Sequence, residues 1–236
     1  IASELSDHTC ECCNSHNMLK LTRQLFRTDP RAHYFDFHEK ALFNHLLGGQ
    51  NPSSAHGHHS YYVPLRPGGQ RSYSNDYQDF TCCHGTGMET NTKHGDSVYF
   101  HSGTTLYVNL FIASVLTWPG RGITVRQDTG FPESAATRLT VTGSGPIDLR
   151  VRIPSWAAGA QLRLNGVVQD VAAVPGFGRG LARIVLQHVR GGDAALQRPQ
   201  GPARQQRHHH DPAALAAGAR PPLCRDDVRL AGPARP

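Results

Sequence analysis

The 236 residues, 38% of them hydrophobic, supply enough apolar material for one large domain or two small ones. The formal net charge is +6 at pH 7, but seven Arg against three Asp in residues 196–236 give +4 of it, and no aromatic residue follows Phe177. Nucleic-acid binding, which combines basic with aromatic side chains, is therefore not expected. No stretch is long and apolar enough to span a membrane, and the N-terminus carries no signal-peptide pattern. The sequence indicates neither the compartment nor the oligomeric state.

Two amphipathic helices are predicted within the first fifty residues. Apolar side chains recur at helical spacing over Asn17–Arg27 and again over Tyr34–Leu47. Asp29-Pro30 separates the two segments, and Gly48-Gly49 ends the second. The short connection predicts an antiparallel helical hairpin.

A loop rich in Gly, Pro, Ser and His follows over residues 50–77. Loops of this length inside a domain are usually functional. Beyond the second cysteine pair, short alternating segments separated by turns indicate strands, and evenly spaced strands are typical of an antiparallel β-sandwich. These strands are expected at 97–100, 105–112, 124–127, 138–141, 147–153 and 161–164.

The last part of the chain differs from the rest. From about Gly191 the periodicity disappears, and Pro, Arg, Ala and Gln dominate. Two interpretations stay open: a disordered extension, or a reading frame lost near Gly191 in a GC-rich gene. The expected fold is therefore α+β and multidomain, with a helical part at 1–95, a β-sandwich at 96–190 and an irregular tail at 191–236.

Five of the six cysteines fall in two clusters, one around Glu11-Cys12-Cys13 and one at Cys82-Cys83. Clustered cysteine favours a metal site or catalysis over a disulfide framework. Three thiolates and a carboxylate meeting at one point would make a four-ligand cage suited to Zn²⁺. A vicinal pair serving one site needs an irregular backbone, and we expect the run His84–Gly87 to form a turn that supplies it.

Other residues of these types have simpler interpretations. Cys10 and Cys12 are expected to be packed thiols. A second metal site is conceivable among His56, His58 and His59, but their Gly-rich loop favours solvated histidines. We assign no role to the run 208–210, three histidines in the tail. Glu89 is expected to be structural, as a cap of a helix beginning near it.

Several motifs, in order, identify a family. The segment Glu11-Cys12-Cys13-Asn14-Ser15-His16-Asn17-Met18-Leu19-Lys20-Leu21 resembles the Glu-x-Cys-x-x-Tyr-Asn-Met-Leu-Lys-Leu segment of glycoside hydrolase family 127, the β-L-arabinofuranosidase family. Further family-like segments lie at 41–45, 61–65, 80–89, 95–100 and 106–111. The resemblance runs from about Leu5 to Val168.

The resemblance implies a fold and a site. The family fold is an (α/α)6 barrel followed by β-sandwich domains, of which this chain would hold the last barrel helices. The family uses a zinc-bound cysteine as nucleophile. By resemblance, Cys82 is the nucleophile, Glu11, Cys13, Cys82 and Cys83 hold the Zn²⁺, and Tyr62 lines the sugar pocket. The expected activity is retaining cleavage of terminal β-L-arabinofuranosides, and the expected partner is an arabinofuranoside or a related plant-polysaccharide oligosaccharide.

One part of the family pattern has no counterpart here. The family's acid/base glutamate lies upstream of the Glu-x-Cys motif, and neither Glu4 nor Asp7 has the surrounding residues of that position. The chain also opens at Ile1 without a methionine. The sequence therefore indicates a fragment, expected to bind zinc weakly if at all and to hydrolyse nothing alone.

Two alternatives of other classes remain. One is a non-catalytic β-sandwich carbohydrate-binding protein with a structural zinc site. The other is a small redox protein that uses Cys82-Cys83 as a vicinal disulfide switch.

Overall fold

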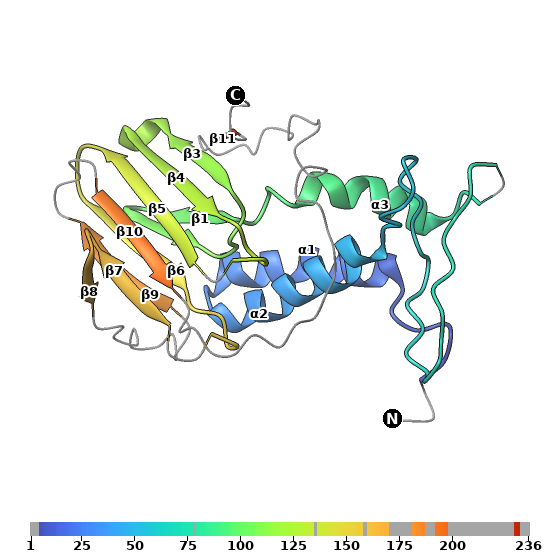
Figure 1. The fold of residues 1–236 in the computed structure, drawn as a ribbon. Helices are drawn as coiled ribbons and strands as arrows, with labels where there is room; N and C mark the ends of the chain where they lie inside the picture. Colours follow the sequence, from blue (N-terminus) through green and yellow to red (C-terminus); the bar gives the residue numbers. More distant parts are fainter. Residues whose placement is uncertain are drawn as a thin grey trace. The chain divides into compact units, whose positions relative to one another are not determined.

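The computed structural model describes residues 5–77, 79–134, 136–157 and 160–169, and the strand backbones at 181–186, 192–197 and 229–231. The chain forms two compact units. The first comprises residues 1–30 and 34–94, and the second comprises residues 31–33 and 95–236. Figure 1 shows the order of the elements: helices first, then strands. The mixed helix and sheet composition predicted from the sequence is confirmed.

Both predicted helices of the first unit are present and are longer than expected. Helix α1 spans Cys12–Thr28, so it begins within the first cysteine cluster rather than after it. Helix α2 spans Ala32–Ala41 and continues through a π turn, Leu42–Leu46, and a 3₁₀ turn, Leu47–Gly49. The two glycines thus end the helical segment, as expected.

Side-chain contacts confirm that the two segments run antiparallel. The partners fall in reverse order along the chain, because early residues of α1 meet late residues of the second segment. These contacts are Ser15 Oγ with His45 Nδ1 at 2.7 Å, Thr22 Oγ1 with His38 Nδ1 at 2.9 Å, and the Phe26 ring with the Phe35 ring at 5.1 Å.

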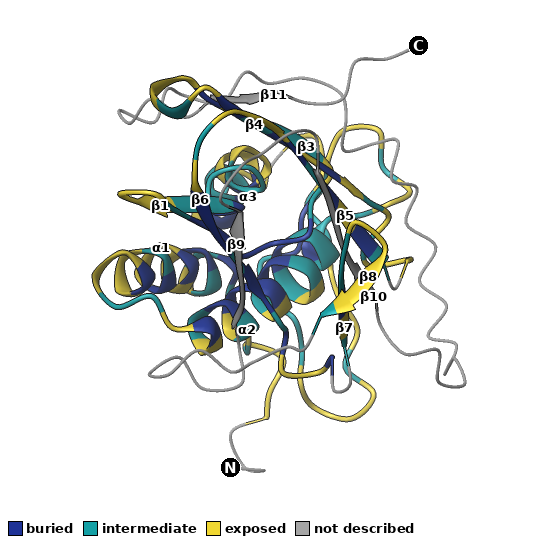
Figure 2. Cartoon of the chain, turned by 90° about the vertical axis from the view of Figure 1, so that its left-hand side faces the viewer, coloured by how far each residue is buried: buried dark blue, intermediate teal, exposed yellow. Residues whose placement is uncertain are grey.

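The buried face of α1 differs from the apolar stripe seen in the sequence. Cys12, His16, Leu19, Thr22 and Phe26 are buried, at the spacing of one helix face, and Figure 2 shows buried and exposed segments alternating along the helix. Polar His16 and Thr22 lie on this face because each has a buried hydrogen-bond partner. In contrast, the apolar side chains of residues 18, 21 and 25 are more than a third exposed.

The second cysteine pair begins a helix rather than preceding a turn. Helix α3 spans Cys82–Lys93 and includes the run His84–Gly87, so the predicted turn is wrong. The His84 side chain explains the helix start, because its Nδ1 accepts the backbone N–H of Thr81 at 2.8 Å. Glu89 does not cap this helix either. It lies on the third turn, and its Oε2 is 3.1 Å from His16 Nε2 of α1.

The second unit contains two sheets. One has the strand order β1-β2-β6-β9 and the other β11-β3-β4-β5-β10-β7-β8. The strands are β1 (Tyr99–Ser102), β2 (Thr105–Val108), β3 (Ser114–Trp118), β4 (Ile123–Thr129), β5 (Ala136–Gly143), β6 (Ile147–Arg152), β7 (Gln161–Leu164), β8 (Val167–Gln169), β9 (Leu181–Leu186), β10 (Gly192–Gln197) and β11 (Arg229–Ala231). All six predicted strands are present, while β3, β8, β9, β10 and β11 were not predicted, and the last two of these lie in the segment expected to be irregular.

One hydrophobic core joins the two sheets. Its buried side chains come from β2 and β6 of the smaller sheet and from β3, β4, β5 and β7 of the larger one. The alternation of side chains along a strand explains how each sheet contributes to this core. In β4, for example, every second residue is buried, namely Ile123, Val125 and Gln127. One pairing corrects the antiparallel prediction: β2 and β6 run parallel, with Leu106 opposite Leu149.

The tail is described only in part. The backbone of 192–197 pairs with β5 and β7, and that of 229–231 pairs with β3. The rest of 191–236 lies outside the described residues, so both interpretations of the tail stay predictions. Among the described residues, no helix combines the length and apolar character needed to cross a membrane.

A buried histidine of the loop packs against two helical segments of the first unit. His59 is 4% exposed, which corrects its expected solvation. Its ring lies against Gly49 and Gly87, where added Cβ atoms would come within 2.8 Å and 3.2 Å of ring carbons. These glycines therefore permit a close approach that a side chain would block.

We expect Gly49→Ala to lower the free energy of unfolding by about 1–3 kcal/mol, because the new methyl group overlaps the His59 ring. The ring cannot move aside without breaking contacts. Its Nδ1 lies 2.8 Å from the Ser60 carbonyl oxygen, and its Nε2 lies 3.3 Å from the Leu46 carbonyl oxygen. Urea unfolding followed by circular dichroism measures the change.

Gly48→Ala is the matched control. Its Cβ would meet only the Phe43 carbonyl oxygen, at an ordinary 3.4 Å. Equal unfolding free energies for the two variants would contradict the role given to His59.

Candidate metal centre

Four side chains from two distant segments of the first unit converge. These are Glu11, Cys13, Cys82 and Cys83, and one ligating atom from each lies within 4.8 Å of every other. The sulfurs of Cys13 and Cys83 are 3.4 Å apart, and Cys82 Sγ is 3.9 Å from Glu11 Oε1. Every residue assigned to the metal by resemblance is therefore in one cluster.

Both cysteine pairs occupy the first turn of a helix. Cys12 and Cys13 begin α1, and Cys82 and Cys83 begin α3. The unpaired N–H groups of a helix N-terminus carry partial positive charge and favour thiolates. The irregular backbone expected for the vicinal pair is therefore unnecessary, because the start of a regular helix presents both sulfurs to one site.

Glu11 precedes α1 at its N-cap position, where side chains often bond to the helix. Here it makes no side-chain capping hydrogen bond, which leaves its carboxylate beside the sulfurs. The backbone at this point is held by the loop, because Glu11 forms a bridge with Tyr62 and the Cys12 N–H donates to the Tyr61 carbonyl at 3.1 Å.

The four cysteines of the two pairs differ in exposure and acidity. Cys82 is exposed, Cys13 half-buried, and Cys12 and Cys83 buried. Burial raises the pKa of Cys12 to about 12, and burial also raises the pKa of Cys83. Cys12 is thus an inert packed thiol, as expected, whereas Cys10 is exposed and corrects that expectation.

Two residues beside the cluster were not identified as site residues from the sequence. The Tyr61 hydroxyl lies 3.3 Å from Cys82 Sγ, and this hydrogen bond lowers the pKa of Cys82 while raising that of Tyr61. Thr86 Oγ1 lies 3.1 Å from Cys13 Sγ. No signal in the sequence pointed to Thr86, because the run His84–Gly87 was expected to be a turn and its partner Cys13 lies on another helix.

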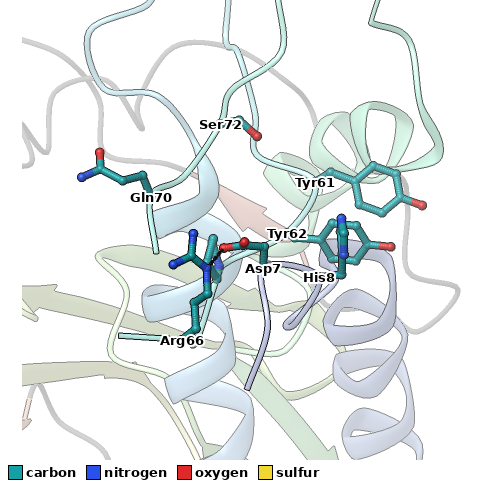
Figure 3. Close-up of a pocket in the computed structure, with 8 residues that line it drawn as sticks. Asp7, His8, Tyr61, Tyr62, Arg66, Gln70 and Ser72 are labelled. Atoms are coloured by element: carbon teal, nitrogen blue, oxygen red, sulfur yellow. Dashed lines mark hydrogen bonds and ion pairs between the residues drawn. The ribbon is translucent and has the colours of Figure 1, made fainter. Parts of the chain in front are cut away.

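A cavity of about 360 Å³ opens beside Tyr61. Figure 3 shows Tyr61 and Tyr62 side by side on its wall, with Asp7 and Arg66 paired nearby. The tyrosine ring centroids are 4.4 Å apart, and Arg66 Nε donates to Asp7 Oδ1 at 2.6 Å. The remaining lining residues are His8, Pro64, Gln70 and Ser72. Tyr62, the residue proposed for the sugar pocket, thus lines a cavity next to the cluster.

The donor set fits a tetrahedral zinc ion. Sulfurs bonded at about 2.3 Å to one tetrahedral ion lie about 3.8 Å apart. A sulfur and a carboxylate oxygen on the same ion would lie about 3.5 Å apart. The 3.4 Å between the Cys13 and Cys83 sulfurs and the 3.9 Å between Cys82 Sγ and Glu11 Oε1 each lie within about half an ångström of these separations. Three sulfurs and one carboxylate also match the preference of zinc for thiolate with nitrogen or oxygen ligands.

The chain is an α+β protein, with helices followed by two sheets. Its helical unit holds a candidate metal centre of one carboxylate and three sulfurs. Two family models match the chain. Residues 1–96 match "Beta-L-arabinofuranosidase, GH127 catalytic domain", and residues 105–179 match "Beta-L-arabinofuranosidase, GH127 middle domain". The chain therefore belongs to glycoside hydrolase family 127, and the resemblance seen in the sequence is confirmed.

Individual relatives are similar over much of this chain. A non-reducing end β-L-arabinofuranosidase of Bifidobacterium longum subsp. longum is 27% identical over 175 residues, which is 66% of this chain and 26% of that protein. A crystal structure of a GH127 β-L-arabinofuranosidase from Geobacillus stearothermophilus T6 aligns with a TM-score of 0.69 at 24% identity, over 86% of this chain and 34% of that one.

A second solved structure, a GH127 β-arabinofuranosidase, gives a TM-score of 0.70 at 23% identity over 80% of this chain and 32% of its own. These structures establish the shared fold. The chain spans about a quarter of its curated relative and about a third of the two solved chains.

Proposed function

We propose that this chain carries the zinc ligands and the nucleophile of a retaining glycosidase that cleaves terminal β-L-arabinofuranosides. The observation that supports this most strongly is the cluster itself. One carboxylate and three sulfurs meet within 4.8 Å, and the exposed sulfur, that of Cys82, lies 3.3 Å from the hydroxyl of Tyr61, which lines an open cavity. The expected substrate is a small carbohydrate, an arabinofuranoside or a related plant-polysaccharide oligosaccharide.

Zn²⁺ would be held by Glu11, Cys13, Cys82 and Cys83. When bound, it would keep the thiols ionised at neutral pH and moderate the nucleophilicity of the sulfurs. All four proposed ligands are among the described residues of the first unit, which supports binding by the chain alone rather than the weak binding expected from the sequence.

Cys82 is the proposed nucleophile because it combines exposure with stabilisation of its thiolate. Its sulfur is exposed, its pKa is lowered by the Tyr61 hydroxyl, and it lies in the first turn of α3. Cys83 and Cys13 lack that access, because one is buried and the other half-buried. They are better placed to hold a metal than to reach a sugar.

The chemical step follows from these positions. The Cys82 sulfur forms a bond to the anomeric carbon while the glycosidic C–O bond breaks, and the leaving oxygen takes a proton. Water then attacks the same carbon, the C–S bond breaks, and the sulfur departs as thiolate with the configuration retained. Tyr62 would pack against the sugar. We assign the acid/base role to no residue of this chain, and Glu11 does not suit it because a metal-bound carboxylate has little proton to offer.

The domain organisation is part of the same proposal. Residues 1–95 would be the last helices of an (α/α)6 catalytic barrel and 96–190 a β-sandwich, and strands β10 and β11 of the segment 191–236 pair with strands of that second unit. Apolar side chains on the helices support further helical partners: residues 18, 21, 25 and 37 are each more than a third exposed.

A bromoacetamide linked to L-arabinofuranose tests the proposal, because it brings the reactive carbon to the sugar pocket. We expect it to modify Cys82 at least about tenfold faster than plain bromoacetamide does, since binding raises the local concentration of the reagent. Peptide mapping by mass spectrometry locates the modified residue.

Cys10 is the control thiol, because it is exposed but lies outside the cluster. Equal modification of Cys10 and Cys82 by both reagents would instead favour a carbohydrate-binding protein with a structural zinc site. Reversible loss of the Cys82 and Cys83 thiols on mild oxidation would favour the redox switch.

A further inference from the structure

A second group of metal-ligating side chains lies in the long loop, apart from the cysteine cluster. His56 Nδ1 is 2.7 Å from Asp76 Oδ1, and His58 Nε2 is 2.8 Å from the same oxygen. The three ligating atoms all lie within 4.8 Å of one another. Two imidazole nitrogens thus approach one carboxylate oxygen, and the two histidines are separated by a single residue in the chain.

The backbone of the loop brings these residues together. The Ser74 N–H donates to the His59 carbonyl at 3.1 Å, and the His59 N–H donates to Ser74 Oγ at 3.1 Å. With 59 opposite 74 in antiparallel segments, position 57 falls opposite 76. Residues 56 and 58 therefore flank Asp76. Between them, Gly57 has φ of +71°, a conformation that suits glycine and bends the chain at this point.

We propose that His56, His58 and Asp76 bind a second divalent transition-metal ion. Two imidazoles and one carboxylate are a recurrent three-residue ligand set for zinc, with the fourth position left to water. Neutral imidazole also suits copper, nickel and iron.

The two contacts to Asp76 need only a small adjustment. Metal–nitrogen and metal–oxygen bonds of about 2.0–2.2 Å would separate the ligating atoms by about 3.3 Å. The nitrogen–oxygen contacts of 2.7 Å and 2.8 Å would therefore lengthen by about half an ångström. His56 can supply that movement, because its side chain is 65% exposed.

Such an ion would fasten the two arms of the loop to each other. His56 and His58 belong to the arm that continues through the buried His59 to Tyr61, and Asp76 belongs to the arm that leads to α3. Both arms therefore end at the cysteine cluster. The proposal does not depend on glycosidase activity, because it concerns metal binding alone.

Titration of the 236-residue chain with Co²⁺ tests the second site, because cobalt distinguishes thiolate from nitrogen and oxygen ligands in its absorption spectrum. We expect two equivalents to bind. One gives sulfur-to-cobalt charge-transfer bands and binds about 100-fold more weakly in Cys13→Ser. The other gives no such bands and is lost in both His58→Ala and Asp76→Asn. The charge-transfer bands that persist in these two variants show that the first unit remains folded.

Two controls address other histidines. His101→Ala removes an exposed histidine of β1, and a triple alanine variant removes the run 208–210 of the tail. Both should keep two equivalents. The proposal is wrong if the unchanged chain binds only the equivalent that gives charge-transfer bands, if the second equivalent survives His58→Ala and Asp76→Asn, or if the triple variant loses it. If Asp76→Asn fails to fold, His56→Ala replaces it in the test, because His56 is exposed, and the same loss of the second equivalent is expected.

Discussion

Replacing Cys82 by alanine is expected to abolish the release of p-nitrophenol from p-nitrophenyl β-L-arabinofuranoside. This leaving group departs without a proton, so the first chemical step needs no acid residue and can be followed with the 236-residue chain. The zinc-loaded chain should release one equivalent in a burst and retain a pentosyl group on Cys82. In Cys82→Ala the rate should fall by at least on the order of 10³-fold, because no other sulfur of the cluster is exposed.

The expected accumulation of the pentosyl enzyme has its own cause. Breaking the C–S bond requires an activated water, and no residue of this chain is assigned to that task. Mass spectrometry of the intact protein and of its peptides should therefore detect the added sugar.

Cys10→Ala is the control for this experiment. It removes a second exposed thiol that precedes α1, and it should leave both the burst and the adduct unchanged. A burst of the same size in Cys82→Ala would remove Cys82 from the nucleophile role. An adduct found on Cys10 would do the same.

The second large effect concerns zinc. Cys13→Ser should weaken Zn²⁺ binding by about 100-fold, measured by competition with a chromophoric chelator. Structural zinc sites bind with about 10–16 kcal/mol over four ligands, so one thiolate contributes about 3 kcal/mol. Cys13 is half-buried, and its sulfur lies 3.4 Å from the Cys83 sulfur. A serine hydroxyl at this position would not replace the lost thiolate as a zinc ligand.

Cys12→Ser provides the comparison. The two cysteines are adjacent in the same helical turn, but Cys12 is buried and lies outside the four-residue cluster. Zinc affinity should remain within about threefold of the unchanged chain, although stability falls because a polar hydroxyl replaces a buried thiol. If Cys12→Ser lost zinc and Cys13→Ser retained it, the ligand register would be shifted by one residue.

Local patterns were sufficient for much of the fold. Helical periodicity located both segments of the first hairpin, and alternation located six strands of the second unit. The errors arose where tertiary contacts compete with local preference. The run His84–Gly87 has the composition of a turn, yet it lies in α3 because His84 caps the helix start and Gly87 packs against His59.

The parallel pairing of β2 with β6 illustrates a different limit. Residues 105–108 and 147–152 each show a strand pattern, but a strand's own residues do not specify its neighbour. That choice depends on how the intervening β3, β4 and β5 associate in the other sheet. No local signal carries this information.

By itself, the sequence determined the chemical types at the site, since sulfur and carboxylate ligands can be recognised wherever they cluster along the chain. Its ordered motifs also determined the family. Only the tertiary structure decided that Cys13 and Cys83 meet, that Cys82 is exposed beside Tyr61, and that Asp76 faces His56 and His58. The physical reason is separation along the chain. Cys13 and Cys83 are 70 positions apart in the chain, and only the packing of α1 against α3 and the course of the loop bring such residues within bonding distance.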